Sequence, residues 1–196
     1  MYSTSSKQKN IMNRDQALAF LRMHVKNERM IAHCLASEAV LRALAERLGE
    51  DADKWAMAGL LHDIDVELTG ADPGTHAMEG SRMLEEKGFD PDIVEAVKLH
   101  NEMAAHGVER HKKLHHALAA GETITGLITA TALVYPDKKV ASVKPKSITK
   151  RMKEKAFAAS VNRDTIRECE KIGLSLPEFV EISLNAMKRV GPQIGL

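Results

Sequence analysis

The fold is decided by a 20-residue apolar stretch, ALAAGETITGLITATALVYP, at residues 117–136. A stretch of this length is long enough to cross a lipid bilayer. However, it contains one glutamate, four threonines and two glycines, and it lacks flanking aromatic belts. We therefore expect a buried core helix over about residues 114–134, closed by Pro136, inside a folded domain.

The sequence on either side of this stretch predicts more helices and no strands. Alanine occurs 25 times and aromatic residues make up only 4% of the chain, which favours helices over sheets. Capping residues and apolar spacing predict a first helix capped by Asn13, then helices over about residues 28–48, 52–63, 75–87, from 91 onward, 148–159, 162–171 and 175–189. We expect an all-α, single-domain helical bundle at residues 13–190, with a flexible leader at residues 1–12 and a tail at residues 191–196.

The composition excludes several classes of protein. The chain carries 28 basic and 27 acidic residues, so it is neither a basic nucleic-acid coat nor an acidic tail protein. Residues 1–14 lack the apolar core of a secretory signal. Two cysteines, Cys34 and Cys169, have no CxxC spacing and suit a reducing compartment. We expect a cytoplasmic protein that binds neither a membrane nor nucleic acid. The sequence does not decide whether the chain forms an oligomer.

Glu122 is the only charged residue in the central apolar stretch. Leu114, Leu118 and Thr125 share its helical face, so burial of that face would also bury the carboxylate. A buried carboxylate is stable only when it is protonated, paired with a basic side chain or bound to a metal. The spacing alone leaves these possibilities open.

Four histidines and one aspartate supply possible partners for Glu122. His62 and Asp63 close the predicted helix over residues 52–63, and His33, His76 and His100 each lie in phase with apolar residues of a different helix. One inward histidine is most often a hydrogen-bonded core residue. Several together, with two carboxylates, favour one shared metal site, because imidazole and carboxylate groups are the usual ligands of zinc, iron and manganese.

The order and context of these residues carry a resemblance to a known family. The segments are Ala58-Gly-Leu-Leu-His-Asp63, His76-Ala-Met-Glu-Gly80, Val97-Lys-Leu-His100 and Thr125-Gly-Leu-Ile128. With His33 before them, they resemble the HD superfamily of metal-dependent phosphohydrolases. The nearest resemblance is to its small, stand-alone HDIG-type members.

The resemblance implies a site for one or two divalent ions, with Mn, Fe, Zn and Mg not distinguished. One ion would be bound by the ligands that come earliest in the sequence, together with the acidic residue of the central helix. A second ion would lie next to the first. The implied ligands are His33, His62, Asp63 and Glu122 for one ion, and His76 and His100 for the other, with Asp63 bridging.

The implied activity is hydrolysis of a small phosphorylated substrate, such as a nucleotide. Paired divalent ions lower the pKa of a bridging water and so generate hydroxide to attack phosphorus. Asp63 and Glu102 are the candidate catalytic residues. A metal-stabilised binding or regulatory module without turnover is the alternative function, and a di-iron redox enzyme is a third.

The chain departs from the family pattern at two places. Glu122 stands where the family usually has aspartate, and Asp65 stands where HDIG proteins have glycine. Asp65 and Glu67 would either border the site or solvate a loop. The basic residues between 138 and 155 would either attract an anion or form a solvated face, and His106, His111, His115 and His116 are expected at the surface.

Overall fold

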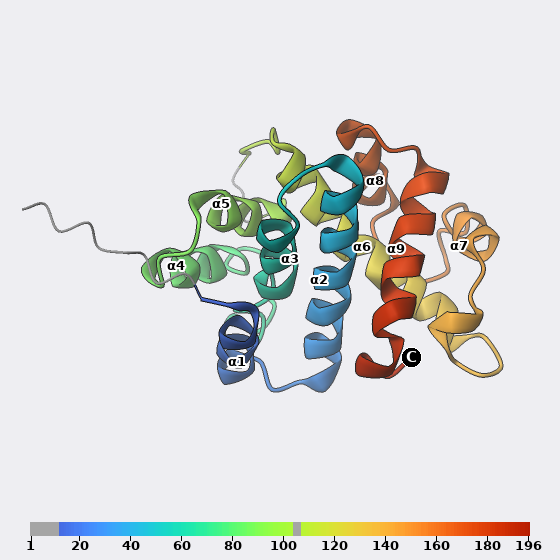
Figure 1. Cartoon of the computed structure of the whole chain (residues 1–196), viewed down its shortest axis with the longest axis horizontal. Coiled ribbons are helices and arrows are strands. Elements are labelled where there is room, and N and C mark those ends of the chain that lie inside the picture. The colour runs from blue at the N-terminus through green and yellow to red at the C-terminus, as the bar shows by residue number, and fades with distance from the viewer. Residues whose placement is uncertain (1–11, 104–106) are drawn as a thin grey trace, which may run out of the picture.

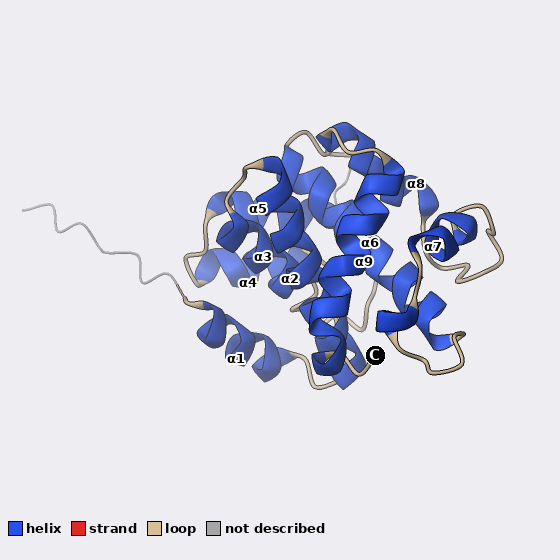
Figure 2. Ribbon diagram, turned by 45° about the vertical axis from the view of Figure 1, so that its right-hand side comes forward, coloured by secondary structure: helices blue, strands red, loops and turns tan. Residues whose placement is uncertain are grey.

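The computed structural model describes residues 12–103 and 107–196. Over these residues the chain is helical and has no strand (Figures 1 and 2), which confirms the predicted all-α fold. The elements are α1 (Arg14–His24), α2 (Glu28–Leu48), α3 (Ala52–Leu61), α4 (Met78–Glu86), α5 (Pro91–His100), α6 (Lys113–Leu133), η1 (Val140–Ser142), α7 (Pro145–Arg151), α8 (Arg163–Ile166), η2 (Arg167–Ile172), α9 (Leu176–Val190) and η3 (Gly191–Gln193).

The two longest helices, α2 and α6, form the centre of the bundle. Helix α2 packs against α3, α6 and α9, while α6 also contacts α5, α7, α8 and η2. In Figure 1, α1, α3, α4 and α5 lie on one side of α2, and α7, α8 and α9 lie on the other. Most of α6 is buried, as its apolar sequence predicts. None of the described helices combines the length and the apolar character needed to cross a membrane.

The helix starts that capping residues predicted are confirmed. Asn13 and Gln16 cap α1 reciprocally, because the side chain of each accepts a hydrogen bond from the backbone N–H of the other, at 2.9 and 3.0 Å. Asp90 caps α5 with Pro91 in the first helical position. Ser175 caps α9. These local signals set where the helices begin, and packing of their apolar faces then sets their arrangement.

Two predicted helices are shorter than expected near the middle of the chain. The helix predicted at residues 75–87 starts only at Met78, because Ala77 has a φ of 77° that no helix accommodates. The helix predicted at residues 52–63 ends at Leu61. Residues 62–77 therefore form turns, and this segment carries His62, Asp63 and His76.

The helix predicted at residues 148–159 is also wrong in its bounds. Helix α7 ends at Arg151, and residues 152–161 form turns in which Ala158 has a φ of 46°. The guanidinium of Arg163 donates hydrogen bonds of 2.6 Å to the carbonyl oxygens of Ala158 and Val161. These side-chain bonds stabilise the turns in place of a helical hydrogen-bond pattern.

The N-terminal end of the chain is described from Met12 onward, and the C-terminal end is described through Leu196. The leader predicted for residues 1–12 lies outside the described residues, apart from Met12. The predicted tail has defined structure, since Gly191–Gln193 forms η3, Gly191 is buried, and the N–H of Leu196 bonds to the oxygen of Gly191 at 3.0 Å.

Helices α2 and α3 approach each other closely at Gly59. A Cβ atom at this position would lie 2.7 Å from the backbone oxygen of Ser37, so Gly59→Ala must push the two backbones apart. We expect this variant to lower the free energy of unfolding by about 1–3 kcal/mol, measured by denaturant titration.

Gly126→Ala is the matched control, because its Cβ would make an ordinary contact of 3.4 Å with a Val161 methyl group. This variant should leave the free energy of unfolding unchanged or raise it by up to about 1 kcal/mol, since alanine favours helix. Equal stability of Gly59→Ala and the unchanged protein would contradict the close α2–α3 packing.

Candidate metal centre

Six polar residues from distant parts of the chain meet in one cluster beside α6. They come from α2, the turn after α3, the turn before α4, the last residue of α5 and the middle of α6. The members of this six-residue cluster are His33, His62, Asp63, His76, His100 and Glu122. The structure thus brings together all the residues that the sequence predicts as metal ligands.

Asp63 lies at the centre of the six-residue cluster. Its Oδ1 faces the Nε2 atoms of His76 and His100 at 3.1 and 3.4 Å. Its Oδ2 faces the Nε2 atoms of His62 and His33 at 3.4 and 3.6 Å. Glu122 Oε2 lies 3.7 Å from His33 Nε2. The carboxylate of Asp63 therefore separates two pairs of imidazoles, and Glu122 lies on the side of the first pair.

The Nδ1 atom of each of the four imidazoles already has a partner. His62 and His100 each bond to the carbonyl oxygen three residues earlier, in Gly59 at 2.9 Å and Val97 at 2.6 Å. These carbonyls lie in the last turns of α3 and α5, where helical partners run out. His76 Nδ1 bonds to Asp65 Oδ1 at 2.7 Å.

The fourth imidazole, His33, bonds through Nδ1 to Thr125 Oγ1 at 2.9 Å. The Thr125 hydroxyl donates its own proton to the carbonyl oxygen of Glu122 at 2.7 Å, so it accepts from His33. A proton on Nδ1 leaves a lone pair on Nε2. In all four histidines, therefore, the nitrogen that faces the centre of the six-residue cluster is Nε2, which carries the lone pair that can bind a metal.

These lone pairs create an electrostatic demand for positive charge. The Nε2 atoms of His33 and His62 are 3.1 Å apart, a separation that is repulsive unless a proton or a cation lies between them. At a metal–nitrogen distance of about 2.1 Å, two ligands of one ion lie about 3.0–3.4 Å apart. The donor types and their spacing thus fit a divalent ion, and two overlapping groups of donors each lie within 4.8 Å of one another: His33, His62 and Glu122, and His62, Asp63 and His100.

The pKa values of residues in the six-residue cluster reflect the same demand for positive charge. Burial lowers the pKa of His33 to about 4, and burial raises the pKa of Glu122 to about 7. Burial also opposes protonation of His76, but hydrogen bonds to Asp63 and Asp65 raise its pKa to about 10. Some of these imidazoles are therefore driven to bind protons and others to lose them.

Asp65 has a role that the sequence left undecided. Its side chain is fully buried, and its Oδ2 accepts hydrogen bonds from the N–H groups of Ala77 and Gly80 at 2.8 and 2.7 Å. Its Oδ1 accepts from His76 Nδ1. This carboxylate therefore fixes both the ring of His76 and the turn that leads into α4. The departure from the HDIG pattern at this position is a signal that could have indicated such a role.

Glu102 does not lie in the six-residue cluster, which corrects its prediction as a catalytic residue. Its side chain is 55% exposed and pairs with Arg110.

The predicted surface position is also wrong for His115 and His116, which are buried, whereas His111 is exposed. His106 lies outside the described residues.

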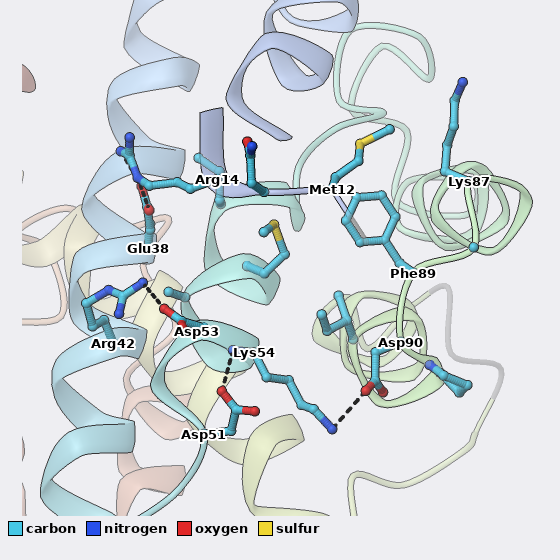
Figure 3. A pocket seen from close by; sticks show the side chains of 17 residues that line it. Met12, Arg14, Glu38, Arg42, Asp51, Asp53, Lys54, Lys87, Phe89 and Asp90 are labelled. Atoms are coloured by element: carbon cyan, nitrogen blue, oxygen red, sulfur yellow. Dashed lines mark hydrogen bonds and ion pairs between the residues drawn. The ribbon is translucent and has the colours of Figure 1, made fainter. Parts of the chain in front are cut away.

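A cavity of about 520 Å³ lies elsewhere, among α1, α2, α3 and the start of α5 (Figure 3). Its charged groups are largely paired with one another, as in Arg14–Glu38, Arg42–Asp53 and Lys54–Asp90. None of the members of the six-residue cluster lines it. Although this cavity is large, it lacks the residues of the six-residue cluster, so we do not assign the reaction to it.

Asp65→Asn tests the support of His76. The amide keeps the size of the side chain but has only one oxygen for three donors, so we expect metal affinity on the His76 side to fall about 10–100-fold in calorimetric titrations. The control is Asp72→Asn in the same turns, where the exposed carboxylate accepts from the Thr75 hydroxyl at 2.8 Å. Equal affinities of the two variants would contradict the role of Asp65.

Glu122 predicts a pH dependence of stability in chelator-treated protein. Its pKa is raised from 4.5 to about 7, so the folded state holds this proton more tightly than the unfolded state. The resulting stabilisation is complete below pH 4.5 and is lost as the pH rises through 7. Compared with the unchanged protein, Glu122→Gln should gain about 2–3 kcal/mol between pH 4.5 and 7.5 in urea unfolding. Parallel pH curves would contradict this, and the exposed Glu181→Gln serves as control.

Comparison with known proteins supports this reading of the site. The family model of the HD domain matches residues 30–131, a range that includes the whole six-residue cluster. No solved structure matches the chain.

Several relatives with curated descriptions are called Ribonuclease Y. Ribonuclease Y of Mycoplasma mycoides is 31% identical over 75 residues, which are 38% of this chain and 18% of that protein. Ribonuclease Y of Sulfurovum sp. (strain NBC37-1) is 26% identical over 138 residues, which are 68% of this chain and 26% of that protein. The match thus spans about a quarter or less of each relative. Because the HD-domain match covers more than half of the chain, the chain belongs to the HD-domain family.

Proposed function

We propose that this chain is a metal-dependent phosphohydrolase that binds one or two divalent ions through the six-residue cluster and hydrolyses a small phosphoester such as a nucleotide. The observation that carries the proposal is the convergence of four imidazole Nε2 atoms on the Asp63 carboxylate, each with its Nδ1 atom already hydrogen-bonded. HD domains are typically metal-dependent phosphohydrolases, which agrees with this chemistry.

The proposed ligands divide between two positions. His33, His62 and Glu122 would hold one ion, His76 and His100 the other, and Asp63 would face both through its two oxygens. Bound divalent ions supply Lewis acidity, which lowers the pKa of coordinated water and offsets charge on phosphoryl oxygens.

In this proposal the protein side chains hold the ions in place and do not react themselves. Glu122 has one oxygen engaged by the Thr123 hydroxyl, which leaves Oε2 to face His33. Cys34 is unsuited to act as a nucleophile, because burial raises the pKa of its thiol well above the ordinary value. The reaction as proposed needs no side-chain nucleophile, and Glu102 has no part in it.

The test combines metal content with activity. Protein purified without oxygen should contain bound divalent metal by elemental analysis and should hydrolyse at least one member of a phosphoester panel with Mn, Fe, Zn or Mg. Asp63→Asn and His62→Gln should lower kcat by at least about 10²-fold while retaining the fold by circular dichroism. His111→Gln, a change at an exposed histidine, should leave kcat unchanged.

Other outcomes would favour the other functions. Metal binding that stabilises the fold without turnover would indicate a regulatory module, and an oxygen-dependent reaction would indicate a di-iron enzyme. Normal folding with no bound metal under any condition would contradict the phosphohydrolase and the di-iron enzyme alike.

RNA is a second candidate substrate, which we propose because of the ribonuclease relatives and the distribution of charge. Residues 137–155 carry eight basic and two acidic side chains, so the rest of the chain has 20 basic and 25 acidic residues. The near-neutral total therefore conceals a basic segment. Its exposed lysines are Lys138, Lys139, Lys144, Lys146, Lys150, Lys153 and Lys155.

The basic segment is connected to the six-residue cluster by one face of α6. Accessible residues on this face follow helical spacing, and they are Glu122, Thr123, Gly126, Thr129, Ala130 and Leu133. Eleven residues of helix span about 16 Å, so a short phosphodiester chain could contact both the basic segment and the cluster. Exposed lysines at the far end of such a path favour an extended polyanion over a single phosphate.

RNA binding can be measured separately from hydrolysis. The triple change Lys146→Gln, Lys150→Gln and Lys153→Gln, made in Asp63→Asn protein, should weaken binding of single-stranded RNA by about tenfold and flatten its salt dependence. Fluorescence anisotropy provides the readout. The charge-matched control changes three exposed lysines outside the segment, Lys26, Lys87 and Lys171. Equal effects of the two triple changes would contradict a role for the basic segment.

A further inference from the structure

Arg110, in the connection between α5 and α6, uses its whole guanidinium group inside the protein. Its side chain is only 7% exposed. Nε donates to Glu168 Oε2 at 2.9 Å, and Nη2 contacts the other oxygen of Glu168 and also Glu102. Nη1 donates to the carbonyl oxygen of Leu99 at 2.9 Å. Arg110 is therefore committed to internal contacts and is not free to bind substrate.

The carbonyl groups that Arg110 contacts belong to the end of α5. Leu99 and His100 are the last two residues of this helix, and Nη1 lies 3.5 Å from the His100 oxygen as well. Terminal carbonyls of a helix lack helical partners and carry partial negative charge. A buried arginine at this position stabilises the last turn of α5, which is the turn that points the His100 ring at Asp63.

Glu168, in η2, links this arrangement to α6. Its side chain is 12% exposed, and its Oε2 also accepts a hydrogen bond from His116 Nδ1 at 2.6 Å. Burial alone would raise the pKa of Glu168, but its bonds to Arg110 and His116 lower it, so the carboxylate stays ionised. His116 lies on α6 six residues before Glu122. One carboxylate thus links α6, through His116, to Arg110 at the end of α5.

We propose that Arg110 and Glu168 form a positioning clamp that holds His100 in place and so sets the affinity of the divalent ion on the His76–His100 side. This inference rests on the proposed function. Glu168 lies beyond residues 30–131, where the HD-domain match ends, so the clamp assigns part of the site's organisation to the C-terminal segment of this chain. Neither residue touches the reacting groups.

Removal of the charge on Glu168 should loosen the clamp without leaving a cavity. Glu168→Gln keeps the shape of the side chain but leaves a nearly buried guanidinium with only the exposed Glu102 as a charged partner. Arg110→Lys keeps the charge but loses the forked geometry that reaches a carboxylate and two helix carbonyls at once. Both variants should free the last turn of α5.

The experiment uses the full chain with two readouts. The first is calorimetric titration of Mn into chelator-treated protein. The His76–His100 side has fewer ligands than the other side, so we expect it to give the weaker binding event. Glu168→Gln and Arg110→Lys should weaken this event about 10–100-fold and leave the tighter event unchanged. The second, independent of metal, is the ¹⁵N spectrum of histidine side chains in chelator-treated protein, in which the His100 ring signals should shift or broaden while those of His62 stay.

A second Arg–Glu ion pair provides the matched control. Arg47 Nε donates to Glu178 at 2.8 Å and joins α2 to α9, at a position 14 residues beyond His33 in α2. Glu178→Gln and Arg47→Lys should change neither readout.

Unchanged His100 signals in both clamp variants would overturn the clamp, as would equal loss of both binding events. If the unchanged protein binds no Mn, Fe, Zn or Mg, the proposed function fails. The histidine spectra then still decide whether Arg110 and Glu168 position His100.

Discussion

The site depends on one electrostatic constraint: four imidazole nitrogens with lone pairs face a single carboxylate in the interior of the bundle. Each lone pair is directed inward because the other ring nitrogen donates to an acceptor in the protein. Such an arrangement needs positive charge at its centre, as protons or as cations. Where protons supply that charge, the pKa of Asp63 lies well below its ordinary value: burial would raise it, but the charge of protonated His62 and hydrogen bonds from the surrounding histidines outweigh that effect.

The helical bundle meets this constraint through the ends of its helices. His62 and His100 lie at or just past the C-termini of α3 and α5, where free carbonyls can accept from their Nδ1 atoms. Gly59 supplies one of these carbonyls and also allows the close approach of α3 to α2, which carries His33. The packing that stabilises the fold is therefore the packing that brings the ligating atoms together. A change in the α2–α3 distance would alter stability and site geometry at the same time.

The parts of the structure that could be predicted are those set by local sequence. Capping residues predicted the starts of α1, α5 and α9, and apolar spacing predicted the buried helix with its single carboxylate. Helical phase, together with the HD resemblance, predicted the six residues that meet in the cluster. The capping and spacing signals lie within a few residues of the features that they predict, whereas the resemblance depends on the order of residues from His33 to Ile128.

The parts that could not be predicted depend on partners far apart in the sequence. Arg110 and Glu168 are 58 residues apart, and nothing near either residue indicates the contact. The burial of His116, which bonds to Glu168 52 residues away, could not be predicted for the same reason. The turns that end α7 early depend instead on nearby bonds from Arg163 to Ala158 and Val161, which helical spacing does not reveal. The chain's total charge also concealed the basic segment, because an average over 196 residues cancels opposite charges that lie in different places.

The most direct test of the central claim is anomalous diffraction from crystals of protein purified without oxygen, recorded at the absorption edge of the metal found by elemental analysis. One or two peaks should lie about 2.0–2.2 Å from the Nε2 atoms of the cluster histidines and the oxygens of Asp63. Ordered side chains with no peak among them, or peaks bound only elsewhere in the protein, would contradict the assignment of a metal centre.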